Sequence, residues 1–237
     1  MIEVYMLRLD ERKAAALHEV MLKYVSPSKR EAAGRFRRPI DAYRSVTGEI
    51  LARLAITKRC KLSNAELSFY KNEYGKPLLD HSSIDFHFNV SHSGDWVVCA
   101  FGDCPVGIDV ELMKQQDLSI AERFFAPVEY NRLMSLAASR QLTYFYQLWT
   151  LKESYIKAVG KGMSIPLDSF SFFIKEDGEI EASLEKGAAA AYFMQTFADE
   201  AHAMALCTYE ETVPIYKQLD YEELESLLST LYVAASC

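Results

Sequence analysis

Long apolar runs are missing from this sequence of 237 residues. No stretch reaches the roughly 18 consecutive apolar residues from which a membrane-spanning helix is predicted. The first six residues, Met-Ile-Glu-Val-Tyr-Met, lack the basic flank and apolar stretch of a secretory signal peptide. We therefore expect a cytoplasmic protein with no membrane partner.

Cysteine is sparse and poorly spaced for a structural role. The five cysteines are odd in number and include no CxxC pair, so we expect reduced thiols, with a disulfide or metal site as the alternative. The histidines include no His-x-x-x-His pair and no other zinc spacing. No Gly-x-Ser-x-Gly elbow is present to support a serine hydrolase.

The overall composition is that of an ordinary soluble globular protein, with half of the residues apolar and a quarter charged. The length suits one large domain or two small ones. The net charge of −7 argues against a nucleic-acid partner that is bound through overall charge.

Positive charge is nevertheless concentrated in one segment. The cations in it are Lys29, Arg30, Arg35, Arg37, Arg38 and Arg44. Only Glu31 and Asp41 oppose them. A basic cluster in an acidic chain suits a small anionic ligand, and a solvated helix face is the alternative.

Alternating apolar residues and turn signals predict several strands. The expected strands cover residues 2–9, 84–90, 96–101, 106–111, 169–175, 179–184, 191–198 and 203–209. Residues 72–77 are expected to form a loop and residues 91–95 a turn, because both are rich in turn-forming residues.

Helical spacing predicts the remaining elements. The expected helices cover residues 11–24, 42–58 after an Asp41 N-cap, 119–125, 127–138 and 142–159, with a short helix after Ser26 and a last one around Leu224–Leu231. Strands and helices mix without strict alternation, which favours an α+β fold with antiparallel sheets.

Two carboxylates lie on one face of the expected strand 106–111. Gly107, Asp109 and Glu111 point to one side, with the Cα atoms of the two acids about 6–7 Å apart. A hard divalent cation such as Mg²⁺ relieves repulsion between such groups, and Gly107 leaves room beside them. A solvent-facing acidic strand end is the alternative.

A second candidate pair lies on the expected helix 142–159. Glu153 and Lys157 are four residues apart and share one helix face. Glu153 is a candidate third metal ligand and Lys157 a candidate phosphate contact. An ordinary surface pair, worth a few tenths of a kcal/mol, is the alternative.

A third candidate is the segment Asn89-Val90-Ser91-His92-Ser93-Gly94. Its hydroxyl and backbone N–H groups could bind phosphate, with His92 as a further donor. Such turns are also often purely structural.

Taken together, these segments resemble a known family. Val-Gly-Ile-Asp-Val-Glu at 106–111 and Trp-Thr-Leu-Lys-Glu-Ser-Tyr-Ile-Lys at 149–157 look like the two-part signature of 4′-phosphopantetheinyl transferases, including the step from Asp109 to Glu153. Four further segments resemble the surfactin-synthetase-activating type, so that the resemblance covers nearly the whole chain: 26–31, 74–77, 88–94 and 166–170.

The resemblance implies a fold. Enzymes of this type are monomers built from two similar α/β halves, a pseudo-dimer with α+β architecture. The halves here would be residues 1–111 and 112–237, with the coenzyme A and metal site in the cleft between them. The short holo-acyl-carrier-protein synthases have about half this length and assemble as trimers, so the length excludes that type.

The resemblance also implies an activity. The enzyme would move the 4′-phosphopantetheine moiety of coenzyme A to a serine of an apo carrier protein and release adenosine 3′,5′-bisphosphate. Mg²⁺ would be required, with Mn²⁺ as the alternative. The carrier could serve nonribosomal peptide, polyketide or fatty-acid synthesis.

Site residues follow from the same resemblance. Asp109, Glu111 and Glu153 would bind the metal. Lys157 would contact the pyrophosphate, and either Glu153 or a metal-bound water would take the serine proton. The remaining contacts to coenzyme A would be Lys29, Arg44 and His92 at the 3′-phosphate, Ser91 and His92 near the pyrophosphate, and Lys76 within the adenine-lining segment 74–77.

One position departs from the family pattern. Where the related enzyme has a second lysine three residues after the first, this chain has Ala32. Either a neighbouring arginine compensates, or the 3′-phosphate is held less tightly.

The segment between the metal ligands, residues 112–144, is expected to flank the site. Its large apolar residues are Met113, Leu118, Phe124, Phe125, Leu133 and Met134. We expect Phe124 and Leu133 in the core and an exposed apolar residue of 112–125 at a carrier-docking surface; the alternative is that all six are internal.

Two other functions remain open. A regulatory protein could bind coenzyme A without transferring anything, and a metal-dependent phosphohydrolase could use the same carboxylates. The presence of Asp109, Glu111, Glu153 and Lys157 together argues against the first.

Overall fold

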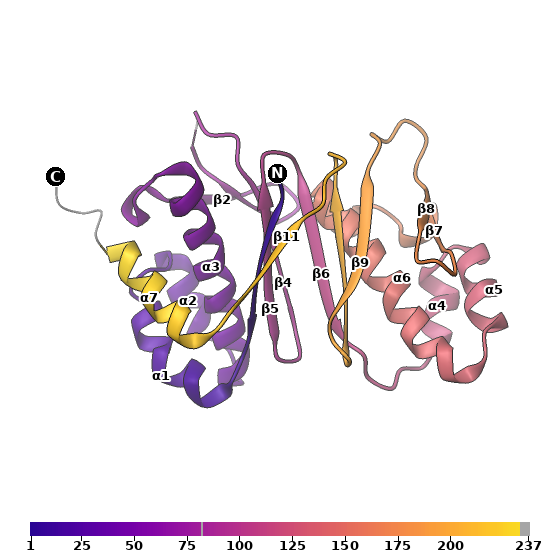
Figure 1. Ribbon diagram of the computed structural model, residues 1–237, viewed down its shortest axis with the longest axis horizontal. Helices are drawn as coiled ribbons and strands as arrows, with labels where there is room; N and C mark the ends of the chain where they lie inside the picture. The colour runs from indigo at the N-terminus through magenta and orange to yellow at the C-terminus, as the bar shows by residue number, and fades with distance from the viewer. Residues whose placement is uncertain (82, 233–237) are drawn as a thin grey trace. The chain divides into compact units, whose positions relative to one another are not determined.

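The computed structural model describes residues 1–81 and 83–232, which form two compact units (Figure 1). The first unit contains residues 1–72, 77–104 and the segment from Thr212 onward. The second contains residues 73–76 and 105–211. The units differ from the expected halves, 1–111 and 112–237, because strand 106–112 belongs to the second unit and the C-terminal segment to the first.

The first unit is built on a four-stranded sheet. Its strand order is β11 (Ile215–Leu219), β1 (Glu3–Arg8), β5 (Trp96–Gly102) and β4 (His87–Ser93). β1 and β11 run parallel, and the other neighbours are antiparallel. A separate hairpin joins β2 (Phe69–Lys71) to β3 (Pro77–Leu79).

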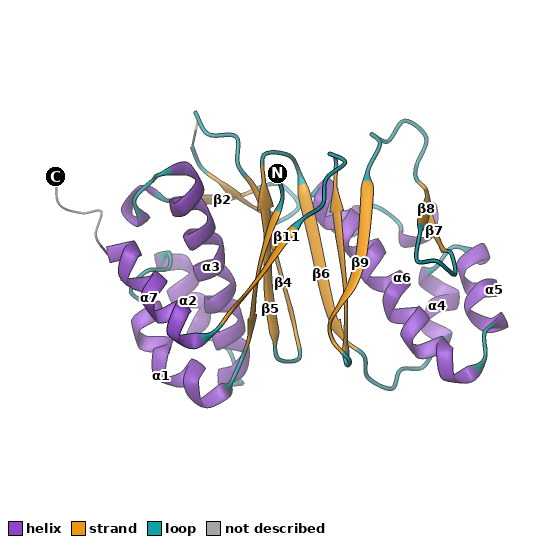
Figure 2. Ribbon diagram, viewed as in Figure 1, coloured by secondary structure: helices purple, strands orange, loops and turns teal. Residues whose placement is uncertain are grey.

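Helices cover one side of this sheet, as Figure 2 shows. They are α1 (Glu11–Met21), α2 (Pro27–Ala33), α3 (Pro39–Cys60) and α7 (Tyr221–Tyr232), and a short 3₁₀ turn, η1 (Asn64–Glu66), follows α3. α3 buries Val46, Ile50 and Leu54, which recur at helical spacing along one face. It begins at Pro39, before the predicted start, so the predicted Asp41 N-cap is wrong: Asp41 lies in the first turn.

The second unit repeats this plan with a three-stranded antiparallel sheet. The strand order is β6 (Val106–Leu112), β10 (His202–Thr208) and β9 (Tyr192–Asp199). The remaining elements are α4 (Ser119–Phe124), α5 (Pro127–Ser135), α6 (Ala138–Val159), η2 (Gly162–Ser164), η3 (Leu167–Ser169) and the hairpin of β7 (Ser171–Ile174) with β8 (Ile180–Ser183).

Both units therefore pack a helix of 22 residues, α3 or α6, against a sheet with antiparallel strands. This confirms the α+β fold and the two similar halves. Within the described residues, no helix combines the length and the apolar character needed to cross a membrane.

The predicted turn at residues 91–95 is wrong in its extent. Ser91 and His92 continue β4 and pair with Val98 and Val97 of β5. Only Gly94 and Asp95 form the turn, and Gly94 has a φ of 53°. Such two-residue turns need a positive φ, which glycine adopts without steric cost.

A buried ion pair fixes α6 within the second unit. The ammonium group of Lys152 lies 2.8 Å from the Glu129 carboxylate, and both side chains are fully buried. Lys152 also donates to the backbone carbonyls of Leu167 and Phe170, both at 2.7 Å. Glu129 accepts from the backbone N–H groups of Ala126 and Phe172. The pair thereby links α5, α6 and the segment that leads into β7.

Candidate active site

A close contact between β6 and α6 organises the site. A Cβ atom added at Gly107 would lie 2.0 Å from the carbonyl oxygen of Ser154 and 2.3 Å from the backbone nitrogen of Ala158. Only glycine permits this approach, because a side chain would collide with backbone atoms of the helix. The space beside Gly107 is thus filled by α6, not left for a ligand as the sequence analysis expected.

This contact brings together Asp109 and Lys157, from segments 48 residues apart. Lys157 Nζ lies 2.6 Å from Asp109 Oδ1 and also donates to the carbonyl of Ile108 at 3.3 Å. The Asp109 side chain is 3% exposed and that of Lys157 is 25% exposed. A partly exposed lysine therefore lies beside a nearly buried carboxylate.

Glu153 lies one helical turn before Lys157 on α6 and is partly buried. Its pKa is raised above the ordinary value, first because burial disfavours the charged carboxylate and then because Asp109 carries the same charge. Lys157 opposes both effects. The structure thus brings Asp109, Glu153 and Lys157 within electrostatic range of one another.

Glu111 lies further along β6 and is partly buried. Among residues 1–81 and 83–232, no three acidic, histidine or cysteine side chains are arranged as a metal site. The donor chemistry of Asp109 and Glu153 still suits a hard divalent cation, since both offer oxygen and their mutual repulsion raises the pKa of Glu153. A cation near both carboxylates would remove that repulsion.

Lys76 contacts the end of α6. Its ammonium donates to the carbonyl of Lys157 at 2.6 Å, of Ala158 at 3.3 Å and of Val106 at 3.4 Å. Burial lowers the pKa of Lys76 to about 8. A cation at a helix C-terminus is stabilised by carbonyl groups and by the helix dipole. Lys76 therefore supports the backbone beside Lys157, and its predicted part in binding coenzyme A stays a prediction.

The other predicted phosphate contacts lie in the first unit, near α3. Lys29 Nζ donates to Ser45 Oγ at 3.1 Å. Arg44 donates through Nε to the carbonyl of Gly94 at 2.8 Å and pairs with Asp41 at 2.7 Å. Arg44 is thereby linked to the β4–β5 turn that follows His92.

Sequence reasoning missed a network that supports Lys29. Glu49 accepts from the backbone N–H of Ser26 at 2.7 Å and lies 2.9 Å from Arg53 Nε. Ser26 is the N-cap of α2, the short helix that carries Lys29. The four-residue spacing of Glu49 and Arg53 predicts an ion pair on one helix face. Nothing local in the sequence indicates that Glu49 also accepts a hydrogen bond from Ser26.

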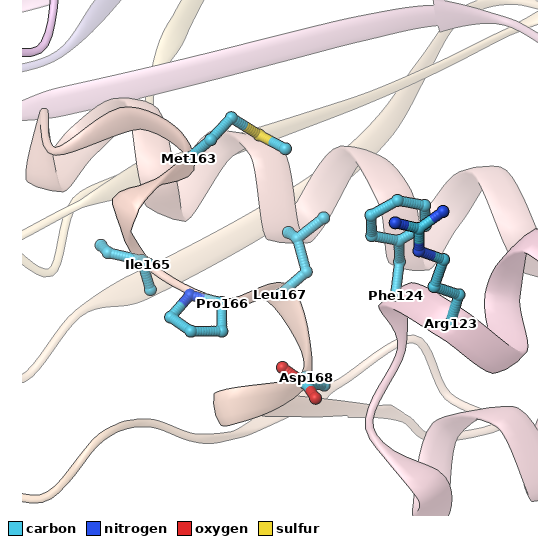
Figure 3. Close-up of a pocket in the computed structure, with 7 residues that line it drawn as sticks. All are labelled: Arg123, Phe124, Met163, Ile165, Pro166, Leu167 and Asp168. Atoms are coloured by element: carbon cyan, nitrogen blue, oxygen red, sulfur yellow. The ribbon is translucent and has the colours of Figure 1, made fainter.

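A pocket of about 230 Å³ lies in the second unit (Figure 3). Arg123 and Phe124 lie on one side of it, facing the segment 163–168. The ring of Phe124 also packs edge-on against Trp149 at 6.3 Å, one turn before Glu153 on α6. Leu133 is fully buried, as predicted, whereas Phe124 is only partly buried and lines this pocket.

The chain is similar to known proteins along most of its length. Residues 105–207 match the 4′-phosphopantetheinyl transferase superfamily, and residues 13–103 match the family described as 4′-phosphopantetheinyl transferase, N-terminal. The chain is 38% identical to 4′-phosphopantetheinyl transferase Sfp of Bacillus subtilis (strain 168), across 94% of this chain and 100% of the relative.

The chain is also similar to a second curated relative and to a solved structure. The chain is 42% identical to 4′-phosphopantetheinyl transferase psf-1 of Bacillus pumilus, across 94% of both chains. The solved holo-[acyl-carrier-protein] synthase (AcpS) of Thermotoga maritima is 22% identical, with a TM-score of 0.39 over 46% of this chain and 64% of that one.

The chain belongs to the 4′-phosphopantetheinyl transferase superfamily. Within it, the similarity is to the Sfp-like transferases. The chain is therefore an enzyme of the phosphopantetheinyl transferase class, which acts on carrier proteins.

Proposed function

We propose that this enzyme transfers the 4′-phosphopantetheine moiety of coenzyme A to a serine of an apo carrier protein in a Mg²⁺-dependent reaction. The observation that carries the proposal is the constellation of Asp109, Glu153 and Lys157, which the contact of α6 with Gly107 brings together. Such a group of two carboxylates and one ammonium suits chemistry at a pyrophosphate.

Mg²⁺ would be held by Asp109, Glu111 and Glu153, with Mn²⁺ as the alternative. When bound, the metal would neutralise and orient the pyrophosphate of coenzyme A. Oxygen ligands and the like-charge repulsion at Glu153 support this assignment.

The chain's own residues have separate roles in the proposed reaction. Lys157 would neutralise charge on the pyrophosphate from its exposed side. Glu153 would accept the proton of the carrier serine, as a carboxylate within electrostatic range of Asp109 and Lys157. The serine oxygen forms the new bond to phosphorus as the bond to adenosine 3′,5′-bisphosphate breaks. A metal-bound water remains the alternative base.

The rest of coenzyme A would be bound by the predicted basic and polar residues. Lys29, Arg44 and His92 would contact the 3′-phosphate, Ser91 the pyrophosphate and Lys76 the adenine segment. Support comes from Arg44, which is linked to the turn after His92, and from Lys29, whose ammonium forms no ion pair with a carboxylate in the described part of the chain.

The acceptor would be a small acidic carrier domain, met by the enzyme as a cytoplasmic monomer. Nonribosomal peptide synthesis is the pathway class that we propose for it. The pocket of Figure 3 supports docking near α4, because it offers the apolar ring of Phe124 beside the cation of Arg123. Polar substitution of Phe124 should then raise the KM for carrier and leave the KM for coenzyme A nearly unchanged.

Mass spectrometry of an apo carrier protein incubated with the enzyme, coenzyme A and Mg²⁺ tests the proposal. One added phosphopantetheine is expected. No mass gain despite binding of coenzyme A would favour a regulatory protein. Release of free phosphopantetheine without an acceptor would favour a phosphohydrolase.

Asp109→Asn should abolish detectable transfer, because the amide keeps the size of the side chain but loses the charge that binds metal. Circular dichroism should show a folded variant. Retained activity at saturating Mg²⁺ would contradict the metal assignment.

A further inference from the structure

Two lysines from different elements lie near each other in the first unit. Lys29 is on α2, and Lys71 is the last residue of β2. The pKa of Lys29 is lowered, first by burial and also by the positive charge of Lys71, while Glu49 opposes the change. Lys71 is therefore close enough for its charge to act on the Lys29 ammonium.

The packing of β2 explains why Lys71 faces this region. The ring of Phe69 lies 5.0 Å from the Arg53 guanidinium and 5.5 Å from the ring of Phe88. Lys71 is two residues further along β2, so it points to the same side of the strand as Phe69. Ser45, whose hydroxyl accepts a hydrogen bond from Lys29, lies about two turns before Arg53 on α3. The strand thus points Lys71 toward α3, the helix whose Ser45 accepts a hydrogen bond from Lys29.

The hairpin fixes this arrangement. Lys71 pairs with Pro77 in the β2–β3 ladder, and Phe69 pairs with Leu79. The exposed side chain of Lys71 can therefore move at its tip while its backbone position is set.

Glu49 offsets part of the positive charge at the two lysines but forms no ion pair with either of them. In residues 1–81 and 83–232, no carboxylate forms an ion pair with Lys29 or Lys71. Glu49 is paired instead with Arg53 and accepts from Ser26. Two ammonium groups repel each other, and a dianion between them would turn that repulsion into two attractions.

We propose that Lys71 and Lys29 together bind the terminal phosphomonoester of coenzyme A, its 3′-phosphate, with Lys71 as a specificity-determining residue. This inference rests on the proposed function and adds a residue to it. A phosphomonoester carries close to two negative charges at neutral pH and three acceptor oxygens, so it accommodates two cations. A ligand that lacks this group gains nothing from Lys71.

Isothermal titration calorimetry with coenzyme A and dephospho-coenzyme A tests the inference. Lys71→Met should weaken binding of coenzyme A roughly tenfold, as expected for one partly exposed charge-assisted contact. Lys71→Glu should weaken it further. Neither variant should change the affinity for dephospho-coenzyme A. Because Lys71 is exposed, both variants should keep the Tm of the wild type.

Lys23→Met is the matched control, since Lys23 is also an exposed lysine of the first unit. It removes the same net charge and should leave both affinities unchanged. Equal losses for both ligands in Lys71→Met, or an unchanged affinity for coenzyme A, would overturn the role of Lys71.

The transfer assay separates this result from the proposed function. A wild type that modifies the carrier, together with a Lys71→Met variant of unaltered affinity, overturns only the inference. A wild type that transfers nothing from coenzyme A overturns the proposed function and the inference with it.

Discussion

The carboxylate of Glu153 lies in surroundings that oppose its ionisation. Because its pKa is higher in the folded chain than the ordinary value of 4.5, folding favours the protonated form. The protonated Glu153 therefore adds to the free energy of unfolding. This contribution is complete below pH 4.5 and is lost as the pH rises through the folded-state pKa of Glu153. At neutral pH the ionised side chain therefore lowers the free energy of unfolding.

Glu153→Gln should consequently raise the Tm of the metal-free enzyme at pH 7 and abolish transfer. The gain in Tm over the wild type should shrink as the pH falls toward 4.5, where Glu153 becomes protonated. Thermal unfolding between pH 4.5 and 8 measures this difference. Glu176→Gln, which changes an exposed glutamate of the same unit, should leave the Tm within error, and an equal gain in both variants would refute the assignment.

The proximity of three residues of the candidate site could be predicted from the sequence. Asp109, Glu153 and Lys157 follow from strand and helix periodicity combined with the family signature, and the structure brings them together. The contacts of Lys76 could not be predicted, because they depend on how the segment 73–76 folds back onto the end of α6. Lys71 also escaped prediction, and under our proposal it supplies the cation missing at Ala32.

Among the elements, β6 and α6 depend on a single glycine. Gly107→Ala should destabilise the enzyme by about 3 kcal/mol, at the upper end of overpacking costs, because the colliding atoms are backbone and cannot rotate away. Urea unfolding gives this value. Gly34→Ala is the control. Gly34 has an α-helical φ of −68°, and a Cβ atom added there would lie 3.6 Å from the nearest atom, the carbonyl oxygen of Glu31. The free energy of unfolding of this variant should differ from that of the wild type by less than about 0.5 kcal/mol.

The buried pair of Lys152 and Glu129 gives a second prediction for α6. Lys152→Met should destabilise the enzyme by about 3–5 kcal/mol, because it leaves the Glu129 carboxylate buried without its countercharge. Adding Glu129→Gln should recover part of the loss, since the second substitution removes that charge. Chemical denaturation of both variants checks this order. A double variant less stable than Lys152→Met would contradict the explanation.

Local patterns predicted most elements and missed those that depend on distant pairing. β11 was not expected, because its alternation is weak and its partner β1 lies about 210 residues earlier in the chain. Ser91 and His92 were assigned to a turn from their composition, yet pairing with Val98 and Val97 keeps them in β4. Tertiary pairing overrides local turn preference in such cases.

In the whole molecule, the first unit is completed by the C-terminal segment. β11 pairs with β1, and α7 buries Leu224, Leu228 and Leu231 in the core of that unit. Truncation after Glu211 should therefore make residues 1–104 sensitive to limited proteolysis and leave 105–211 comparatively resistant. Val213→Ser, at a site 88% exposed, should not change the digestion pattern. Uniform resistance of the truncated chain would contradict this dependence.

The same arrangement affects how the chain leaves the ribosome. β1 is made well before its parallel partner β11, which follows only after all of residues 105–211. At translation rates of about 5–20 residues per second, the synthesis of residues 105–211 alone takes roughly 5–20 seconds. During this time the nascent chain carries an unpaired strand edge, which is a site where other chains can add. The second unit can fold during this time. The first unit therefore begins to be made first but is completed last.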